Sequence, residues 1–501
     1  MKPTRAARYA AINMPKITIN GKHLEVPAGT TLLKAAQQLG VYIPRYCYHP
    51  KLSISGNCRM CLVEVANSPK LVTACSTEAA EGMAVLTNSD KVKKARREVL
   101  EFLLINHPLD CPVCDQAGEC GLQDYYMDYS QQQSRFAAAD KTRRQKRRPI
   151  GPHLMLDNER CILCTRCVRF CAEVTKTAEL EVMERADRSF IDLKEGRGLD
   201  NGYSLNITDI CPVGAFTSRD FRFKTRVWFL KKTPSICLGC ATGCKIEAHH
   251  DQNIIYRLVP RPNAETNTWL CDTGRMTYKT VQAGDRLAKA LIRKGLIDIE
   301  PALREAATRL DEVKGATAVL GSPWLSLEDN AALARLAKDA LKTANYCFDF
   351  NSVQGIKDGI LINKDPAPNT AGLKAFKGGL SMQEFTGLLA DGKIKALVTE
   401  AKAYGLVKTA AAAAGMRLII FALTRGEAPE TAHAVLPYAS YFETEGTFVN
   451  YQGLRRSTAA AVEPPRGIKP LWAVVNKLAS YSGAELHLDS AAAALEGPEF
   501  K

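Results

Sequence analysis

The spacing of the cysteines is the strongest constraint on what this chain can fold into. Of 17 cysteines in 501 residues, all but Cys171 and Cys347 fall, together with one histidine, into four successive sets. The sets are Cys47, Cys58, Cys61 and Cys75; His107, Cys111, Cys114 and Cys120; Cys161, Cys164, Cys167 and Cys211; and Cys237, Cys240, Cys244 and Cys271. Thiolates at such spacings bind iron–sulfur clusters, and several clusters in one chain can conduct electrons along it.

A disulfide framework is the first competing interpretation. The cysteines occur in C-x2-C pairs, all but Cys347 lie before residue 272, and no secretory apolar segment precedes them. Reduced thiols in an intracellular compartment fit this pattern better than disulfides do.

The first two sets differ in their donors. The first, C-x10-C-x2-C-x13-C, supplies four thiolates for a 2Fe–2S cluster, and its tight loop at residues 56–61 is expected to aim backbone N–H groups at sulfur. The second, H-x3-C-x2-C-x5-C, lacks a fourth cysteine nearby. We therefore expect His107 to complete a 4Fe–4S site, a purely structural histidine being the alternative.

The third set opens as C-x2-C-x2-C-x3-C, a run in which the fourth cysteine normally serves a second cluster. No second run follows, so we expect Cys211 to complete this 4Fe–4S site and Cys171 to be a small buried hydrophobe. The fourth set, C-x2-C-x3-C-x26-C, is compatible with zinc. The C-x2-C-x3-C spacing at the start of this set, and the presence of three other cluster sites in the chain, favour a further 4Fe–4S cluster.

The pattern of apolar residues predicts two kinds of fold along the chain. Residues 15–80 indicate a strand at 17–19, a turn at Asn20-Gly21, a returning strand at 23–26, a helix at 32–39 capped by Thr31, and a strand at 61–65, the layout of a plant-type ferredoxin. A helix is expected over 90–106. From about residue 276, helical stretches alternate with apolar runs at 317–321, 396–398 and 418–421, which predicts an α/β domain with a parallel sheet.

The net charge of +14 does not by itself indicate a nucleic-acid partner, because thiolate-bound clusters would offset part of it. The basic run at 141–148 is expected to be a solvated loop, with contact to an acidic partner surface as the alternative, and no aromatic residues are interleaved as nucleic-acid binding would favour. Residues 1–13 are interpreted as an overlong start before Met14, or as a transit-peptide stub.

The composition also bounds what the chain does. The longest apolar runs, such as residues 418–423, fall far short of the roughly 18 residues that a membrane span requires. No glycine-rich nucleotide loop follows a strand, and no nucleophile is paired with a base. We expect a chain that moves electrons, with no complete active site of its own and no direct membrane span.

In this order the four sets resemble the family of large iron–sulfur subunits of respiratory complex I, known as the G subunit in bacteria and the 75-kDa subunit in mitochondria. The segments at 111–120 and 209–215 look very like that family, and those at 441–450 and 453–456 resemble its molybdopterin-oxidoreductase-like region. The resemblance covers nearly the whole chain.

The resemblance implies a multidomain α+β and α/β fold. The expected domains are a 2Fe–2S ferredoxin-type (β-grasp) domain at 1–90, a 4Fe–4S segment with one histidine and three cysteine ligands at 91–150, a 4Fe–4S bacterial-ferredoxin-like domain at 151–225, a 4Fe–4S domain of molybdopterin-oxidoreductase N-terminal type at 226–275, and a truncated molybdopterin-oxidoreductase-like α/β domain at 276–501. The chain is short for the family and shows no molybdenum ligand, so no molybdopterin is expected.

The resemblance also implies an electron-transfer subunit of the peripheral arm of NADH-quinone oxidoreductase, an oxidoreductase and translocase. Its expected partners are the FMN/NADH-binding subunit, a 2Fe–2S thioredoxin-like subunit, and ferredoxin-like and quinone-site subunits. The expected location is peripheral, on the cytoplasmic face of the bacterial inner membrane, or on the matrix side if the source is eukaryotic. The fourth cluster would lie off the electron path.

Three other identities compete. Electron-transfer subunits of NAD-reducing hydrogenases share the early sets but usually stop before the α/β region. A formate dehydrogenase chain would need a molybdenum ligand, and Cys347 is in no such context. An FeFe-hydrogenase would need several late cysteines. A remnant scaffold with a structural role is a further interpretation of residues 276–501.

Overall fold

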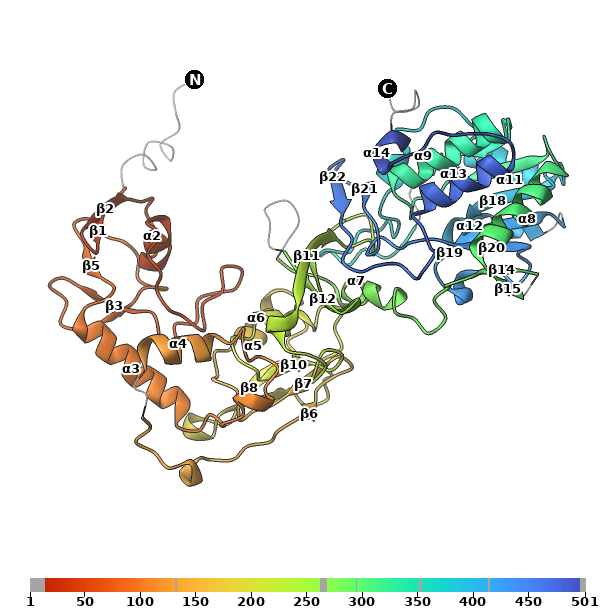
Figure 1. The fold of residues 1–501 in the computed structure, drawn as a ribbon. Coiled ribbons are helices and arrows are strands. Elements are labelled where there is room, and N and C mark those ends of the chain that lie inside the picture. The colour runs from red at the N-terminus through yellow and green to blue at the C-terminus, as the bar shows by residue number, and fades with distance from the viewer. Residues whose placement is uncertain are drawn as a thin grey trace, which may run out of the picture. The chain divides into compact units, whose positions relative to one another are not determined.

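The computed structural model describes residues 14–130, 133–261, 268–293, 295–350, 354–412 and 415–495. The expectations for residues 1–13 therefore lie outside the described residues. The chain divides into two compact units, one up to residue 229 and one from residue 230 onward, and each is described by itself (Figure 1).

The first unit begins with a five-stranded sheet of order β2-β1-β5-β3-β4. Its strands are β1 (Lys16–Ile19), β2 (Lys22–Glu25), β3 (Leu62–Val65), β4 (Val72–Thr73) and β5 (Ala84–Leu86). The predicted hairpin is confirmed, because Asn20 and Gly21 both have positive φ and join β1 to β2. The predicted helix is confirmed as α2 (Leu32–Gln38), whose first turn is capped by the Thr31 hydroxyl accepting from the Lys34 N–H.

Helices and short sheets follow that sheet. The helix predicted over 90–106 is α3 (Asp90–Leu104), and it packs on β3 and on α4 (Gly121–Tyr129). The remaining elements of the first unit are η1 (Cys111–Val113), η2 (Ala138–Asp140), β6 (Arg148–Pro149), β7 (Leu154–Leu156), α5 (Arg166–Glu173), β8 (Leu180–Met183), η3 (Ala186–Arg188), β9 (Phe190–Leu193), α6 (Asn206–Ile210), β10 (Phe216–Ser218) and η4 (Val227–Phe229). Strands β10, β7 and β6 form one small sheet, and β8 and β9 form a hairpin.

The second unit opens with an antiparallel sheet of β11 (Lys231–Ile236), β12 (Lys245–Asp251) and β13 (Ile254–Pro260), followed by α7 (Asp272–Arg275) and η5 (Thr277–Thr280). A second small sheet pairs β21 (Gly446–Val449) with β22 (Arg455–Thr458). The buried residues of this region include Ile246, Leu258 and Phe442, which form one apolar cluster with two of the cysteines.

The main sheet of the second unit has the order β15-β14-β20-β19-β18-β16-β17. Its strands are β14 (Ala290–Ile292), β15 (Gly295–Ile297), β16 (Thr317–Leu320), β17 (Tyr346–Cys347), β18 (Ala396–Glu400), β19 (Arg417–Ala422) and β20 (Ala434–Pro437). Strands β16 to β20 are parallel and β14 and β15 form an antiparallel edge, so the predicted parallel sheet is confirmed.

Helices flank this sheet (Figure 1). They are α8 (Ile299–Asp311), α9 (Leu327–Arg335) with the π-helical turn η6 (Leu336–Ala340), α10 (Thr370–Leu373), α11 (Met382–Ala390), α12 (Ala401–Ala412), η7 (Arg425–Glu427), α13 (Leu471–Tyr481) and α14 (Ala491–Ala494). Helix α13 packs on α8 and α9, whereas α11 packs on α12. The strand order turns back between β16 and β18, which is where parallel α/β sheets generally bind ligands.

Candidate metal centres

The first cysteine set is brought together beside the five-stranded sheet. Cys47, Cys61 and Cys75 are almost fully buried, and Cys58 is partly exposed on the loop before β3. Hydrogen bonds from Cys58 and Cys75 lower the pKa of the Cys47 thiol, and the same contacts raise the pKa of those two partners. The backbone N–H groups of Cys58 and Asn57 also lower the pKa of Cys47, so this loop does aim donors at sulfur.

The third set surrounds the start of α5. Cys161 and Cys164 lie on the turn that enters the helix, where Leu163 and Thr165 adopt positive φ, and Cys167 lies in the first turn of the helix itself. Burial raises the pKa of all four thiols, and other thiols of the set raise the pKa of Cys161, Cys164 and Cys167 further. Backbone N–H groups of residues 213, 215 and 216 point at Cys211 and oppose the effect of its burial. Such donors stabilise a thiolate and the negative charge of a cluster bound to it.

The second set borders a single cavity. His107, Cys111, Cys114 and Cys120 all line a space of about 450 Å³ between the end of α3 and the start of α4. Cys111 is exposed at its edge, whereas Cys114 and Cys120 are buried. The sequence therefore places three thiols and one imidazole around a space much larger than one ion.

The imidazole of His107 is kept neutral. Burial lowers its pKa to about 4, with further contributions from the positive charges of Arg160 and Lys141. A neutral imidazole has a nitrogen lone pair free to bind a metal, which a protonated one lacks.

Gly214 lies where the backbone of the third set passes next to a thiol of the second set. It follows the third-set ligand Cys211 by three residues, yet a Cβ built on Gly214 would lie only 2.3 Å from the Cys114 sulfur of the second set. The N–H of Gly121, at the start of α4, donates to the Pro212 carbonyl in the same segment at 3.2 Å. The wall of one ligand cavity is thus built by the backbone that carries a ligand of the other.

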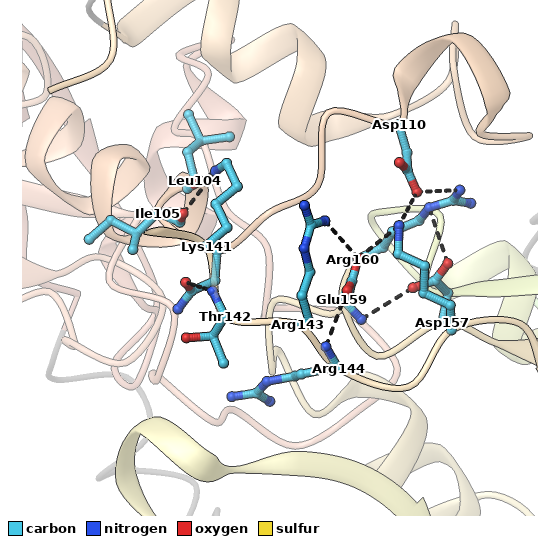
Figure 2. A network of polar contacts seen from close by, with 12 residues as sticks. Leu104, Ile105, Asp110, Lys141, Thr142, Arg143, Arg144, Asp157, Glu159 and Arg160 are labelled. Atoms are coloured by element: carbon cyan, nitrogen blue, oxygen red, sulfur yellow. Dashed lines mark hydrogen bonds and ion pairs between the residues drawn. The ribbon is translucent and has the colours of Figure 1, made fainter. Parts of the chain in front are cut away.

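A network of charged side chains includes Asp110 and Arg160, which directly precede the ligands Cys111 and Cys161 in the sequence (Figure 2). Asp110, the neighbour of Cys111, accepts from Lys146 at 2.8 Å and from Arg160 at 3.0 Å. Burial raises the pKa of Asp110, but these two hydrogen bonds outweigh it and the net pKa is lowered. Lys146 also pairs with Glu159 at 2.7 Å, and Arg160, which is 2% exposed, pairs with Asp157 at 3.4 Å.

The basic run is therefore not simply a solvated loop, and that expectation is wrong for four of its residues. Lys141 donates to the Leu104 and Ile105 carbonyls at 2.7 and 2.8 Å and so caps the end of α3, as Figure 2 shows. Three other residues of the run, Arg144, Lys146 and Arg148, are half-buried and bonded to residues 187, 189, 110, 159 and 192. Arg143 and Arg147 are exposed, as expected.

The fourth set is assembled in the second unit. Cys237, Cys240 and Cys244 lie in the turn between β11 and β12, and Cys271 caps α7. All four line a cavity of about 270 Å³. A Cβ on Gly274 would come within 2.8 Å of the Cys237 sulfur and 3.1 Å of the Cys271 sulfur, so glycine is required where these thiols approach the backbone.

The donor sets fit clusters of several irons. The second and fourth sets surround cavities, as is suitable when each thiolate binds a different iron of one cluster. Within the described residues, no three His, Cys, Asp or Glu side chains are grouped closely enough to hold a single metal ion.

The two remaining cysteines lie elsewhere. Cys171, on α5, is fully buried, and burial followed by the charge of Glu179 raises its pKa. Cys347 is fully buried at the end of β17 in the apolar core of the second unit.

Among residues that sequence reasoning missed, Gly214 and Arg160 are prominent, and only the position of Gly214 soon after Cys211 could have signalled its role.

A smaller cavity of about 110 Å³ lies at the turning point of the main sheet. Its lining includes Asp329, in the segment that follows β16, Glu400, the last residue of β18, and Tyr438, directly after β20. Burial raises the pKa of both carboxyl groups, that of Asp329 to about 6.

Five family models match successive parts of the chain. They are the 2Fe-2S iron-sulfur cluster binding domain at residues 13–90, the NADH-ubiquinone oxidoreductase-G iron-sulfur binding region at 96–135, the ferredoxin-like domain of NADH-quinone oxidoreductase subunit 3 at 151–217, the molybdopterin oxidoreductase Fe4S4 domain at 230–283, and molybdopterin oxidoreductase at 395–481. Each ligand set lies wholly or largely within one of the first four.

Curated relatives agree with these matches. The chain is 39% identical over 351 residues to the NADH-quinone oxidoreductase G subunit of Streptomyces coelicolor, which covers 68% of this chain and 42% of the relative. It is 38% identical over 390 residues to the mitochondrial NADH-ubiquinone oxidoreductase 78 kDa subunit of Neurospora crassa, covering 72% and 52%. The G subunit of Rickettsia conorii is 38% identical over 338 residues, covering 66% and 50%. The chain spans about half the length of the curated relatives it matches.

Solved structures resemble parts of the chain. A chain of an NAD+-reducing [NiFe]-hydrogenase in the H2-reduced state is 28% identical with a TM-score of 0.38, covering 42% of this chain and 91% of that one. Acetylene hydratase from Pelobacter acetylenicus is 11% identical with a TM-score of 0.39, covering 51% and 70%. Within the described residues, no helix combines the length and apolar character needed to cross a bilayer.

Proposed function

This chain is a homologue of the G subunit of NADH-quinone oxidoreductase, and on that premise we propose that it is an electron-transfer subunit of such a complex. The observation that carries the proposal is the assembly of four complete donor sets, two of them around cavities large enough for a cluster. The complex would oxidise NADH at a flavin on a neighbouring subunit, and this chain would relay the electrons toward quinone.

The sixteen residues of the four sets would hold the cofactors. We assign a 2Fe–2S cluster to the first set and 4Fe–4S clusters to the other three, and the matching family descriptions support cluster binding in each region. When bound, such clusters accept and release single electrons at potentials that ligand type, charge and hydrogen bonding adjust. We also retain the five-domain division at 1–90, 91–150, 151–225, 226–275 and 276–501 as part of the proposal.

The protein's own contacts suggest an order for the sites of the first unit. Side chains of α5 in the third set bond to the loop of the first set. The backbone after Cys211 of the third set forms the wall beside Cys114 of the second. We therefore place the third site between the first and the second, so that electrons would pass from first to third to second.

The fourth site has a different setting. Its four cysteines come from the β11–β12 turn and the start of α7 in the second unit, and residues of the segment from Ile356 to Pro366 complete the wall of its cavity. A tetrahedral zinc site would bring four thiolates onto one ion, whereas these four thiols surround a cavity of about 270 Å³. We propose a 4Fe–4S cluster here, off the electron path, and no molybdopterin in the α/β domain that follows.

The partners and location follow from homology alone. We propose contact with an FMN/NADH-binding subunit, a 2Fe–2S thioredoxin-like subunit, and ferredoxin-like and quinone-site subunits. The assembly would place this chain peripherally, on the cytoplasmic face of a bacterial inner membrane or on the matrix side in a mitochondrion.

The test is to isolate the full chain anaerobically and count its metals. One 2Fe–2S and three 4Fe–4S clusters correspond to about 14 iron atoms per chain. About 10 iron atoms with one zinc would refute the fourth assignment, and stoichiometric molybdenum would refute the absence of molybdopterin. A chain without bound iron would refute the proposed function. Co-purification with subunits that oxidise NADH and reduce quinone would support it.

A further inference from the structure

Helix α5 carries two arginines between the first and third ligand sets. Arg166 and Arg169 are three residues apart, so they project from the same face of the helix. One nitrogen of Arg169, Nη2, donates both to the Cys47 carbonyl at 2.6 Å and to the Cys164 carbonyl at 3.1 Å. A single guanidinium therefore joins the backbone of a first-set ligand to that of a third-set ligand.

Arg166 repeats this arrangement with its two terminal nitrogens. Nη2 donates to the Tyr48 carbonyl at 2.7 Å, and Nη1 donates to the Ile210 carbonyl at 2.9 Å. Tyr48 follows the first-set ligand Cys47, and Ile210 precedes the third-set ligand Cys211. Both arginines thus connect the same two ligand loops.

Other contacts hold these loops together. The Asn57 side-chain amide donates to the Leu163 carbonyl at 2.9 Å, and the Ser53 N–H donates to the Glu173 carboxylate at 2.8 Å. These contacts involve no ligand residue, although Asn57 and Leu163 each directly precede one. Arg169, in contrast, bonds to the carbonyls of two ligands, and Arg166 bonds to carbonyls next to two ligands.

The charge of Arg166 acts on both sets. Arg166 directly precedes the third-set ligand Cys167, and its guanidinium bonds to the carbonyls of the residues next to Cys47 and Cys211, so its positive charge lies close to both sets. A fixed positive charge close to a cluster stabilises the more negative, reduced state and so raises its potential.

We propose that Arg166 and Arg169 are positioning residues that fix the separation of the first and third clusters and raise the potentials of both together. This inference rests on the proposed function, because it requires clusters at both sets. Arginine suits the role because its planar group presents five donors in a fixed geometry, whereas lysine offers one compact ammonium that cannot reproduce a fork between two loops.

The experiment compares full-length, anaerobically isolated variants by EPR-monitored redox titration. In Arg166→Met the charge is lost, and the potentials of the first and third clusters should both fall by up to about 59 mV, a tenfold change in a one-electron equilibrium. In Arg169→Lys the charge is kept, but one ammonium replaces the two nitrogens, Nη1 and Nη2, that together reach the Ser53, Cys47 and Cys164 carbonyls. Its potentials should stay close to wild type, while the magnetic interaction between the two reduced clusters weakens. Arg188→Met, which removes an exposed arginine of η3 in the same unit, is the matched control.

The outcomes separate the inference from the proposed function. Wild-type protein that lacks clusters at these two sets would refute the proposed function itself. With both clusters present, a shift at only one site, or an equal shift in Arg188→Met, would overturn the inference. So would an unchanged magnetic interaction in Arg169→Lys. If Arg166→Met fails to fold, Arg166→Lys supplies the same comparison of magnetic interaction with the charge retained.

Discussion

Gly214→Ala should cause loss of the iron of the second site. The backbone conformation at this position is one that alanine can adopt. The backbone of Gly214 does not have the positive φ that excludes other residues, so the substitution adds one methyl group and little else. That methyl would lie 2.3 Å from the Cys114 sulfur and 3.1 Å from Cβ of Gln116. Ordinary contacts between heavy atoms are about 3.5–4.0 Å, so the sulfur must move by about 1 Å or more.

The free-energy cost of the added methyl group can be estimated. Inserting a methyl into a packed interior usually costs about 1–3 kcal/mol. Cys114 is buried, and the added methyl would also crowd Gln116 Cβ at 3.1 Å, so we expect the strain to relax by displacing the thiol into the cavity. A displacement of that size is several times the tolerance of a metal–ligand bond, which is about 0.2 Å. We expect the second cluster to be lost or strongly destabilised.

Iron content and EPR of the anaerobically isolated chain provide the measurement. Iron should fall from about 14 to about 10 atoms per chain, with loss of the signal that His107 variants also alter. Gly202→Ala is the control, because Gly202 is exposed, lacks positive φ, and would place its methyl in open space. Full iron content and an unchanged second-site potential in Gly214→Ala would refute the steric reasoning.

Three further predictions concern single residues. His107→Cys should retain the second cluster but lower its potential in a redox titration, because a thiolate adds one negative charge where imidazole is neutral; an unchanged potential would show that His107 is not a ligand. Cys171→Ala and Cys347→Ser should each leave the iron content at about 14, since the other cysteines and His107 complete four sets, and loss of an EPR signal in the first would contradict Cys211 as a ligand. Burial, followed by the charge of Arg257, lowers the pKa of His249 to about 3, below its ordinary value of about 6.5, so its neutral form stabilises the fold above pH 6.5 and that stability is lost as pH falls toward 3. Denaturant unfolding of His249→Gln between pH 8 and 5 should show a pH slope shallower than wild type by up to about 1.4 kcal/mol per unit below pH 6.5, and identical slopes would contradict this.

Local signals in the sequence predicted much of the fold. The Asn20-Gly21 turn, the Thr31 cap and the apolar runs of the parallel sheet each depend on residues close together in the chain, and the structure confirms all three. These elements are set by backbone conformation and by the period of apolar residues, which a single sequence displays directly.

The contacts that connect the ligand sets could not be predicted in this way. Arg169 bonds to Cys47, 122 residues away, and Lys141 caps a helix that ends 37 residues earlier. The role of Lys146 depends on two carboxylates, Asp110 and Glu159, that only the folded chain brings together. The sequence shows that residues 141–148 are basic, but it does not show which of these charges are solvated and which are paired.

The first three sites share backbone segments and side chains, so the sequence of one site constrains that of its neighbour. Gly214 and Arg169 each lie between two ligand sets, whereas the four cysteines of the fourth site all come from the β11–β12 turn and the start of α7. The backbone shared by the first three ligand sets therefore constrains them together. Loss of one cysteine from the fourth set is expected to leave the other three in place, because its four cysteines all lie in the second unit.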